Sequence, residues 1–562
     1  MIKQVLSLLS REEKRLSIRV VATVFLRALL DFAGVAALIP ILIMVMGDSP
    51  DRWKILFLCC GVLLFVLCKN GLSYLLTRYQ SQYLLNINKR LSQAMFSRYY
   101  ERGLLFLKSK STVQLGYEVN FICYMFSLNV LAPMLRICSE SVLLLFIIIT
   151  LLVFSPLAGL LLCLVLLPLL FIYARAVKGR MTQYGKEELE ARRRQSRLVV
   201  EAFRGYSELE INHAFHSSLE TFRQGLDKIT SCRLRYERLQ FLPMLISEAS
   251  IVIGIMLLLL VTQGDLRIVS GVFAVAAYRM IPSARMLLAS WTSLQNAAHA
   301  IQTVQEGIAE EKQLQGESSA EISFQKEIEI RHLSFSFPDG DTVLKDFNLT
   351  IPRGQCLGIQ GTSGSGKTTL FHLMLGFFPP TGGEICIDGT PLTPQSRASW
   401  HKLVGYVPQD IFIIHGSLAE NLALGQEHID KEKIRKVLQQ VHLDAWAEAL
   451  PEGIDTPLGE YGSRLSGGQK QRIGIARALY KEAEVLFFDE ATSALDNATE
   501  SEITSALEEL SAHLHGITLI IIAHRDSSLR FCDKIINIEN IVHQHYDADI
   551  SFHSRPSYRP FR

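Results

Sequence analysis

GTSGSGKTT at residues 361–369 and LSGGQ at residues 465–469 are the two stretches that decide the fold of this chain. The first fits the phosphate-binding pattern G-x-x-x-x-G-K-[ST], in which glycines let backbone N–H groups surround a polyphosphate. Lys367 is expected to contact the β- and γ-phosphates, and the Thr368 hydroxyl to bind Mg²⁺ at the start of a helix. The predicted loop residues are Gly361, Thr362, Ser363, Gly364, Ser365, Gly366, Lys367, Thr368 and Thr369. We therefore expect the C-terminal half to bind ATP and Mg²⁺.

A second element of this site is predicted where VLFFDE occupies residues 485–490. An uninterrupted apolar run of this kind is typical of a buried parallel strand, and its carboxyl end lies at the edge of the sheet where ligands bind. Asp489 is expected to hold the metal, directly or through water. Glu490 is expected to act as the general base on the attacking water.

The motifs taken together resemble those of the ABC ATPases, and the whole chain resembles an ABC exporter half-transporter. LSGGQ resembles the signature of that family, and VPQD at 407–410, SALD at 493–496 and IAHR at 522–525 follow the family's order. The resemblance implies that Gln409 reaches the metal and the water, that His524 bonds the γ-phosphate, and that Asp496 belongs to the nucleotide site. Phe337 stands where the family usually has a tyrosine against the adenine, and its ring retains the stacking face.

The signature also predicts a partner. In the family's fold these residues cannot reach the phosphate loop of their own domain, and they complete the site of a second domain instead. The signature residues assigned to nucleotide binding are Ser466, Gly467, Gly468 and Gln469. One copy of each motif is present, and neither the loop nor Glu490 nor His524 is degenerate, so a symmetric homodimer with two active sites is expected.

The N-terminal half has the composition of a membrane domain. The 562-residue chain is 49% hydrophobic with a net charge of +2, and its mean hydropathy is +0.22. Most of the excess lies before residue 300, in six apolar segments, most of them long enough for the ~20 residues of a bilayer crossing. These segments are residues 20–46, 55–76, 130–154, 157–173, 241–262 and 268–289. The uneven distribution of basic residues indicates membrane topology and not nucleic-acid binding.

The polar stretches between the segments predict the topology. Residues 78–129 and 175–240 are long and carry basic clusters such as Arg192 to Arg194, which places them in the cytoplasm together with both termini and the ATPase domain. The chain is thus expected to be a multi-pass protein of the inner membrane. The resemblance implies that short coupling helices near 112–121 and 203–212 touch the ATPase domain.

The expected fold class is an all-α domain of six membrane helices fused to a P-loop α/β ATPase domain with a helical subdomain. The predicted boundaries are residues 1–314 for the membrane domain, 315–327 for a linker, 328–540 for the ATPase domain and 541–562 for an atypical tail.

Ionisable residues inside the apolar segments are the best indication of cargo, because each is costly unless it is paired or faces water. The spacing of Arg27 with Asp31, and of Arg136 with Glu140, suggests local i,i+4 neutralisation. The cations without a local acid are Lys69, Arg279 and Arg285, with Glu248 as a possible partner across helices. Three cations in one cavity would suit an anionic head group, although interhelical struts are an equal alternative.

Asp31, Lys69 and AYRMIPSA at 277–284 are similar to positions in the bacterial flippases for lipid-linked oligosaccharides. That resemblance implies ATP-driven flipping of an anionic glycolipid to the outer leaflet. Alternatives are a multidrug or lipid A-type exporter with the same ATPase, and an ATP-gated regulator or channel. The ten scattered cysteines indicate neither a metal site nor a disulfide framework, and the N-terminus lacks the features of a cleaved signal peptide.

Overall fold

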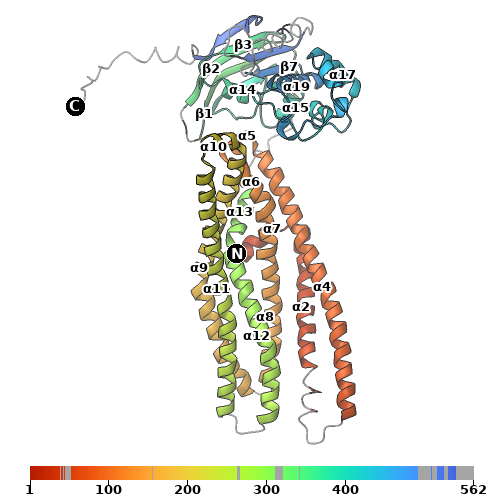
Figure 1. Ribbon diagram of the computed structural model, residues 1–562, viewed down its shortest axis with the longest axis vertical. Helices are drawn as coiled ribbons and strands as arrows, with labels where there is room; N and C mark the ends of the chain where they lie inside the picture. Colours follow the sequence, from red (N-terminus) through yellow and green to blue (C-terminus); the bar gives the residue numbers. More distant parts are fainter. Residues whose placement is uncertain are drawn as a thin grey trace, which may run out of the picture. The chain divides into compact units, whose positions relative to one another are not determined.

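The computed structural model describes residues 1–37, 40–41, 44, 52–154, 156–261, 266–309, 321–338, 340, 342–490, 505, 508, 516–523 and 529–539. The chain divides into two compact units, Met1–Gln313 and Leu314–Arg562. The first is helical and the second contains both sheets (Figure 1).

The first unit consists of long helices joined by short ones. The long helices are α2 (Arg11–Ala36), α4 (Arg52–Glu101), α8 (Ala132–Phe154), α9 (Pro156–Arg204), α11 (Phe215–Val261) and α12 (Leu266–Asn296). The shorter helical elements are α1 (Ile2–Leu8), α5 (Gly103–Ser109), α6 (Thr112–Tyr117), η1 (Glu118–Ile122), α7 (Cys123–Met125), η2 (Phe126–Leu131), α10 (Tyr206–Ile211) and α13 (Ala298–Ile308).

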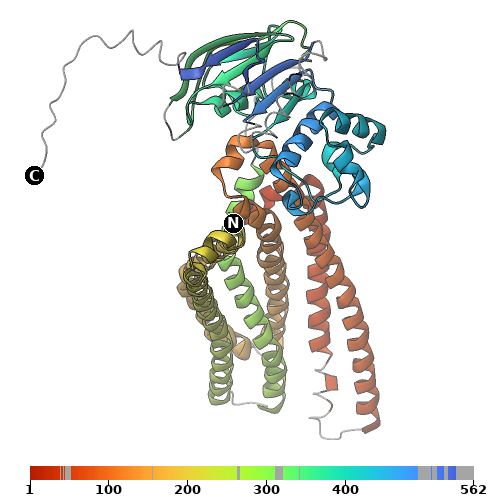
Figure 2. The ribbon, with the colours of Figure 1, turned by 45° about the horizontal axis from the view of Figure 1, so that its top comes forward.

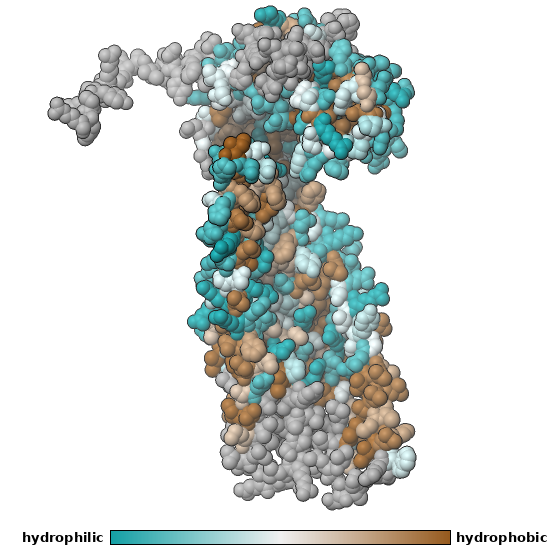
Figure 3. All heavy atoms as spheres, viewed as in Figure 1, coloured by the Kyte–Doolittle hydropathy of each residue, from teal (hydrophilic) through white to brown (hydrophobic). Residues whose placement is uncertain are grey.

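Each of the six apolar segments coincides with one long helix, as far as the described residues extend. Within those residues, two helical stretches are both long and apolar enough to cross a bilayer, Trp53–Glu101 and Thr112–Val153. In α4 the apolar side chains of the first turns lie on the surface, with Trp53 80% and Phe57 84% exposed. Figure 3 shows hydrophobic side chains gathered over this end of α4. Such an exposed apolar surface is suited to lipid rather than to water.

Helices α4, α9 and α11 continue well past their apolar segments. Helices α9 and α11 pack along each other, and both views show them side by side (Figures 1 and 2). Both helices pack against α12. The buried side chains Met181 of α9, Tyr236 of α11 and Leu288 of α12 belong to one hydrophobic cluster. Gly185 lets α9 approach α12 closely, because a Cβ there would lie 2.0 Å from the Asn296 carbonyl oxygen.

Short helices α6 and α10 occupy the two positions at which coupling helices are predicted. A buried carboxylate anchors the first of them. Glu118 is 6% exposed and accepts hydrogen bonds from Tyr99 Oη (2.6 Å), Gln114 Nε2 (2.9 Å) and Arg193 Nη2 (2.7 Å). Because Tyr99 lies on α4 and Arg193 on α9, this one side chain ties the segment after α6 to two long helices.

The described residues of the second unit contain nine strands. They are β1 (Glu327–Ser336), β2 (Thr342–Pro352), β3 (Cys356–Gln360), β4 (Gly382–Ile387), β5 (Thr390–Pro391), β6 (Val404–Val407), β7 (Val485–Asp489), β8 (Thr518–Ile522) and β9 (Lys534–Asn537). Its helical elements are α14 (Lys367–Met374), α15 (Arg397–Leu403), α16 (Leu418–Leu422), α17 (Lys431–Gln440), α18 (Asp444–Glu448), η3 (Gly453–Asp455), η4 (Glu460–Gly462) and α19 (Gly467–Tyr480).

The strands form two sheets. Strands β2, β1, β4 and β5 make an antiparallel sheet, and β6, β7, β8, β3 and β9 make a parallel one, in these orders. Strands β7 and β8 are buried at every residue, as their continuous apolar runs predict. The phosphate loop follows β3, and Asp489 ends β7, so both lie at the carboxyl edge of one parallel sheet. The helices from α16 to α18 form the helical insert between β6 and β7.

Candidate functional site

The loop between β3 and α14 has a backbone that needs glycine at two positions. Gly366 is the N-cap of α14 with φ of 95°, and a Cβ on it would lie 2.9 Å from Val343 Cγ1. Gly361 has φ of 153°, and its Cβ would lie 2.7 Å from Ser365 Oγ. Other residues would be strained at both positions, so the glycines of the motif are required by the turn itself.

Polar groups of this loop are arranged to receive an anion. Lys367 is 5% exposed, and its Nζ donates to the carbonyl oxygens of Gly361 (2.9 Å) and Thr362 (2.7 Å). Ser365 Oγ is buried and has no hydrogen-bond partner among the described residues. A buried hydroxyl without a partner is costly, and a phosphate oxygen would satisfy it. The lysine charge, the orphaned hydroxyl and the start of α14 therefore fit a polyphosphate.

Two oxygen ligands suitable for Mg²⁺ lie together where α14 starts and β7 ends. Thr368 Oγ1 is 3.3 Å from Asp489 Oδ1, and Asp489 is 4% exposed. A hydroxyl and a carboxylate are hard oxygen donors of the kind that Mg²⁺ prefers. Two of the three predicted metal ligands, Thr368 and Asp489, are thus brought together by β3 and β7, which are separated in the sheet only by β8. The third, Gln409, contacts Glu490.

Tyr406 is a neighbour of the metal-binding carboxylate that the motifs do not identify. Its hydroxyl is 3.5 Å from Asp489 Oδ2. Burial, followed by the charge and hydrogen bond of Asp489, raises the pKa of Tyr406. The phenol therefore remains protonated and donates to the carboxylate. The contact arises because β6 pairs in parallel with β7, and no motif around Tyr406 predicts that pairing.

Glu490 lies directly after β7 in a left-handed conformation, with φ of 52°. Its backbone N–H donates to the Ile522 carbonyl oxygen (3.0 Å), which holds the turn against β8. Gln409 Nε2 donates to Glu490 Oε2 at 3.1 Å. Such strained backbone is rare for a residue other than glycine and tends to occur at functional sites. The structure therefore brings together the two residues expected to handle the attacking water.

Phe337 is 38% exposed at the end of β1 and belongs to an aromatic cluster. Its ring meets Phe335 edge-on, with centroids 5.0 Å apart, and Phe378 at 6.0 Å. Phe335 in turn stacks on Phe378 at 5.5 Å. These contacts hold the Phe337 ring in place while part of the ring stays exposed. The exposed part could stack on a planar base.

The signature residues begin α19. Ser466 is the N-cap, its Oγ accepting from Gln469 N (3.2 Å) while Ser466 N donates to Gln469 Oε1 (2.9 Å). The Gln469 side chain is therefore engaged in capping the helix. Ser466 and Gly467 are exposed, and in the described part of the unit no hydrogen bond joins residues 466–469 to the phosphate loop. Asp496 and His524 lie outside the described residues, so their assignments stay predictions.

Glu539 is a further residue at the loop that sequence reasoning missed. Its Oε1 accepts from Thr362 N at 2.7 Å and also from the Thr362 hydroxyl. The contact exists because β9 pairs with β3, which places the residues after both strands next to each other. No local pattern around Glu539 predicts that pairing.

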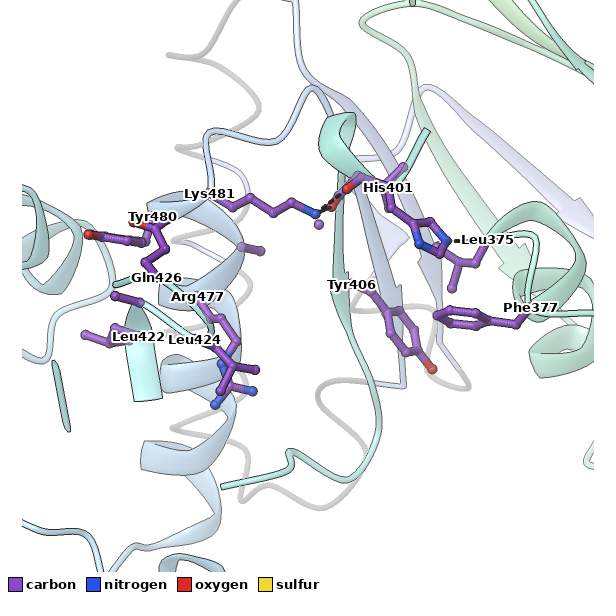
Figure 4. A pocket seen from close by; sticks show the side chains of 14 residues that line it. Leu375, Phe377, His401, Tyr406, Leu422, Leu424, Gln426, Arg477, Tyr480 and Lys481 are labelled. Carbon is purple, nitrogen blue, oxygen red and sulfur yellow. Dashed lines mark hydrogen bonds between the residues drawn. The ribbon is translucent and has the colours of Figure 1, made fainter. Parts of the chain in front are cut away.

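A separate cavity of about 390 Å³ lies between the sheet and the helical insert (Figure 4). The rings of Phe377 and Tyr406 flank one side, 6.4 Å apart, and Arg477 approaches from α19 on the other. Burial lowers the pKa of Arg477, and its Nε donates to the Asn421 carbonyl oxygen (2.8 Å). Tyr406 therefore belongs both to this cavity and to the surroundings of Asp489.

In the helical unit the structure changes the expected pairing of charges. Asp31 Oδ1 lies 2.8 Å from Lys69 Nζ, and Asp31 Oδ2 lies 3.5 Å from Arg279 Nη2. Asp31 thus joins three helices instead of neutralising Arg27, and it takes the place suggested for Glu248. Two of the three predicted cargo cations are therefore engaged in an interhelical ion cluster. Arg285 is exposed, with Nη1 4.0 Å from Met244 Sδ.

Arg27, whose predicted partner Asp31 is engaged elsewhere, lines a cavity of about 560 Å³ between α2, α4, α8 and α12, and Arg136 lines the same cavity. Arg27 Nη1 donates to Thr77 Oγ1 at 3.1 Å. Within the described residues, neither arginine has a carboxylate at ion-pair distance, and Glu140 Oε2 in the same cavity has no hydrogen-bond partner. Instead of the predicted i,i+4 ion pairs, the described residues show two guanidinium groups and one carboxylate in a cavity that is otherwise lined largely by apolar side chains.

Comparison with known proteins gives consistent results. The family model described as ABC transporter matches residues 344–493. An ATP-dependent lipid A-core flippase of Burkholderia thailandensis is 30% identical over 90% of this chain and 86% of its own length. The uncharacterized ABC transporter ATP-binding protein YwjA of Bacillus subtilis is 41% identical over 38% of this chain. In that protein, and in a lipid A-core flippase of Saccharophagus degradans, the match spans only 36% of the relative's length.

Among solved structures, a bacterial Atm1-family ABC exporter with ATP bound superposes with a TM-score of 0.80. The likeness covers 96% of this chain and 99% of that one at 20% identity. At this identity the likeness concerns the fold alone, and it confirms the predicted fold class of helical unit plus ATPase unit.

Proposed function

Because this chain belongs to the ABC transporter family, we propose that it is an ATP-driven exporter that acts as a homodimer. The observation that supports the ATPase most strongly is the grouping of Thr368, Asp489, Glu490 and Gln409 beside the phosphate loop. These side chains come from the start of α14, the end of β7 and the loop after β6, and they meet at the carboxyl edge of the parallel sheet, where such sheets bind ligands.

Each residue of the site has a different role in the proposed hydrolysis. Lys367 and the N–H groups of the loop bind the β- and γ-phosphates, with Ser365 Oγ as a further donor. Thr368 and Asp489 would hold Mg²⁺, which neutralises phosphate charge when it is bound. Glu490 accepts the proton of the attacking water, and Gln409, already bonded to it, orients that water. Asp496 and His524 are proposed to complete the site.

Two copies are proposed because the signature of one chain would complete the site of the other. Ser466 and Gly467 are exposed at the start of α19, where a helix N-terminus can meet a phosphate. ATP binding would close the paired ATPase units and hydrolysis would reopen them, which drives the helical units between inward-open and outward-open states. The helical unit is proposed to span the inner membrane, with the ATPase unit and both termini in the cytoplasm.

For the cargo, we propose a lipid whose head group is anionic. Arg27 and Arg136 line one cavity together with Glu140, and no ion pair within the described residues engages either arginine. Two cations against one acid leave the cavity net positive, which suits phosphate or diphosphate. Lys69 and Arg279 are assigned a structural role in this proposal, since both bind Asp31. A lipid-linked oligosaccharide and a lipid A-type glycolipid share this head-group chemistry. The second is favoured by relatives that are named ATP-dependent lipid A-core flippases.

Translocation in proteoliposomes tests the proposal. Labelled polyprenyl-diphosphate oligosaccharide and labelled lipid A would be offered separately to wild type, Glu490→Gln and Arg136→Gln, with Arg285→Gln as the matched control. We expect ATP-dependent movement of one glycolipid by wild type and by the control, its loss in Glu490→Gln, and reduced transport with retained ATPase in Arg136→Gln.

The alternatives predict other results. Robust ATPase without movement of either glycolipid would favour a multidrug exporter, and equal transport by Arg136→Gln and wild type would remove the cavity arginine from the cargo site. Currents gated by ATP without net transport would favour a channel.

A further inference from the structure

Cys356 and Cys532 are 176 residues apart in the chain, yet their Sγ atoms lie 3.3 Å from each other. Cys356 is the first residue of β3, and Cys532 lies in the turn that precedes β9. All ten cysteines are free thiols. Across the described residues, no other two cysteine sulfurs lie within hydrogen-bonding distance, so this pair differs from the rest.

The sheet holds the two residues next to each other. Strands β3 and β9 are parallel neighbours, with Leu357 opposite Lys534. Cys356 N donates to Asp533 Oδ2 at 2.8 Å, and Cys532 N donates to the Leu529 carbonyl oxygen at 3.0 Å. A disulfide bond is about 2 Å long, so the two sulfurs, which lie 3.3 Å apart, need to approach each other by only about 1.3 Å. A bond between the sulfurs therefore requires little movement of the backbone.

The two thiols differ in access. Cys356 is 2% exposed and packs in the apolar core, and the hydrogen bond with Cys532 together with burial raises the pKa of Cys356. Cys532 is partly exposed. An oxidant in solution consequently reaches Cys532 first. Cys356, which is buried next to Cys532, is the second thiol to react.

We propose that Cys356 and Cys532 are a reversible disulfide-forming pair, oxidised by small-molecule disulfides such as oxidised glutathione. The Cys532 thiolate attacks one sulfur of the oxidant, and one glutathione thiolate leaves. Cys356 then loses its proton and attacks Cys532 Sγ in the mixed disulfide, which expels the second glutathione. The two protein thiols give up two electrons and two protons, and the oxidant becomes two thiols.

The bond would stabilise the ATPase unit. It closes a loop that contains the phosphate loop, the helical insert and β7, which restricts the unfolded chain. It also ties β3 to β9 at the ends opposite the nucleotide, while Glu539 after β9 holds Thr362. Because no residue of the nucleotide site is altered, the oxidised protein should still hydrolyse ATP. In a reducing cytoplasm the bond would form only under oxidative conditions.

The test uses the full chain in detergent, treated with oxidised glutathione and then alkylated and digested. We expect a peptide linking Cys356 to Cys532, no glutathione left on Cys532, and a midpoint of thermal unfolding higher by about 5 °C, reversed by dithiothreitol. Cys532→Ser should abolish the shift. Cys386→Ser is the matched control, because Cys386 is buried in the other sheet and should leave the shift intact.

Stable glutathionylation of Cys532 without the linked peptide would overturn the proposal, as would thiols that remain reduced under this treatment. If Cys532→Ser does not fold, the mass of the linked peptide from wild type still decides the outcome. The assay does not involve cargo, so its failure is distinguishable from failure of the proposed transport function.

Discussion

Glu490 is the residue on which the proposed hydrolysis depends most. Replacing it by Gln keeps the shape of the side chain and removes the base, so we expect steady-state ATPase to fall by about 100-fold or more. Glu482→Gln is a closely matched control, because Glu482 also has a left-handed backbone (φ of 59°) but pairs with Lys433. Hydrolysis by Glu490→Gln at the wild-type rate would exclude Glu490 as the base.

Asp31 carries the ion cluster of the helical unit. Asp31→Asn leaves Lys69 and Arg279 without a counter-ion, and breaking a largely buried pair costs about 3 kcal/mol. We expect a clearly lower unfolding midpoint in detergent. Glu237→Gln is the control, because it breaks an exposed i,i+4 pair with Arg233 and should cost under about 1 kcal/mol.

If Asp31 neutralises Lys69 and Arg279, the double variant Asp31→Asn with Lys69→Gln should regain part of the stability that Asp31→Asn loses. Equal midpoints for Asp31→Asn and Glu237→Gln would contradict the cluster.

At the scale of elements, the packing of α9 on α12 depends on one glycine. Gly185→Ala would place a Cβ 2.0 Å from the Asn296 carbonyl oxygen, and backbone cannot yield as a flexible side chain can. We expect a loss of about 1–3 kcal/mol in the free energy of unfolding. Thermal unfolding followed by circular dichroism measures it.

Gly179→Ala provides the control on the same helix, since a Cβ at Gly179 meets nothing within 4 Å. Alanine favours helix over glycine, so this variant should be as stable as wild type or slightly more so. A destabilisation equal to that of Gly185→Ala would show that helix α9 tolerates no alanine, for reasons other than contact with α12.

At the scale of the whole molecule, the proposed composite sites predict complementation. In a mixed dimer of Lys367→Ala with Ser466→Arg, one site contains both defects and the other contains neither. Mixed dimers should therefore recover up to about half of the wild-type ATPase, while each variant alone stays inactive. Differently tagged copies and tandem purification isolate the mixed species. Isolated mixed dimers without any recovered hydrolysis would contradict this arrangement of sites.

How far the fold could be predicted depends on how local its determinants are. The six helices followed from runs of apolar residues, and the order of strand, glycine loop and helix followed from residues 356–374 alone. The positions of Lys367, Thr368, Asp489 and Glu490 could be predicted equally well, because each stands at a fixed place at or after the end of a strand. Hydrophobic periodicity and motif spacing act over short distances along the chain, so reading the sequence captures them.

Only the folded chain decided which distant residues became neighbours. Asp31 had a suitable partner four residues away, yet it binds Lys69 and Arg279, because three helices present their charges at one level. That choice left Arg27 to line a cavity that Arg136 also lines. Likewise, Glu539 reaches Thr362, and Cys532 reaches Cys356, only because β9 pairs with β3. The sequence determines which charged groups and thiols the chain contains. The free energy of burying each of them depends on its neighbours, and packing across the whole unit selects those neighbours.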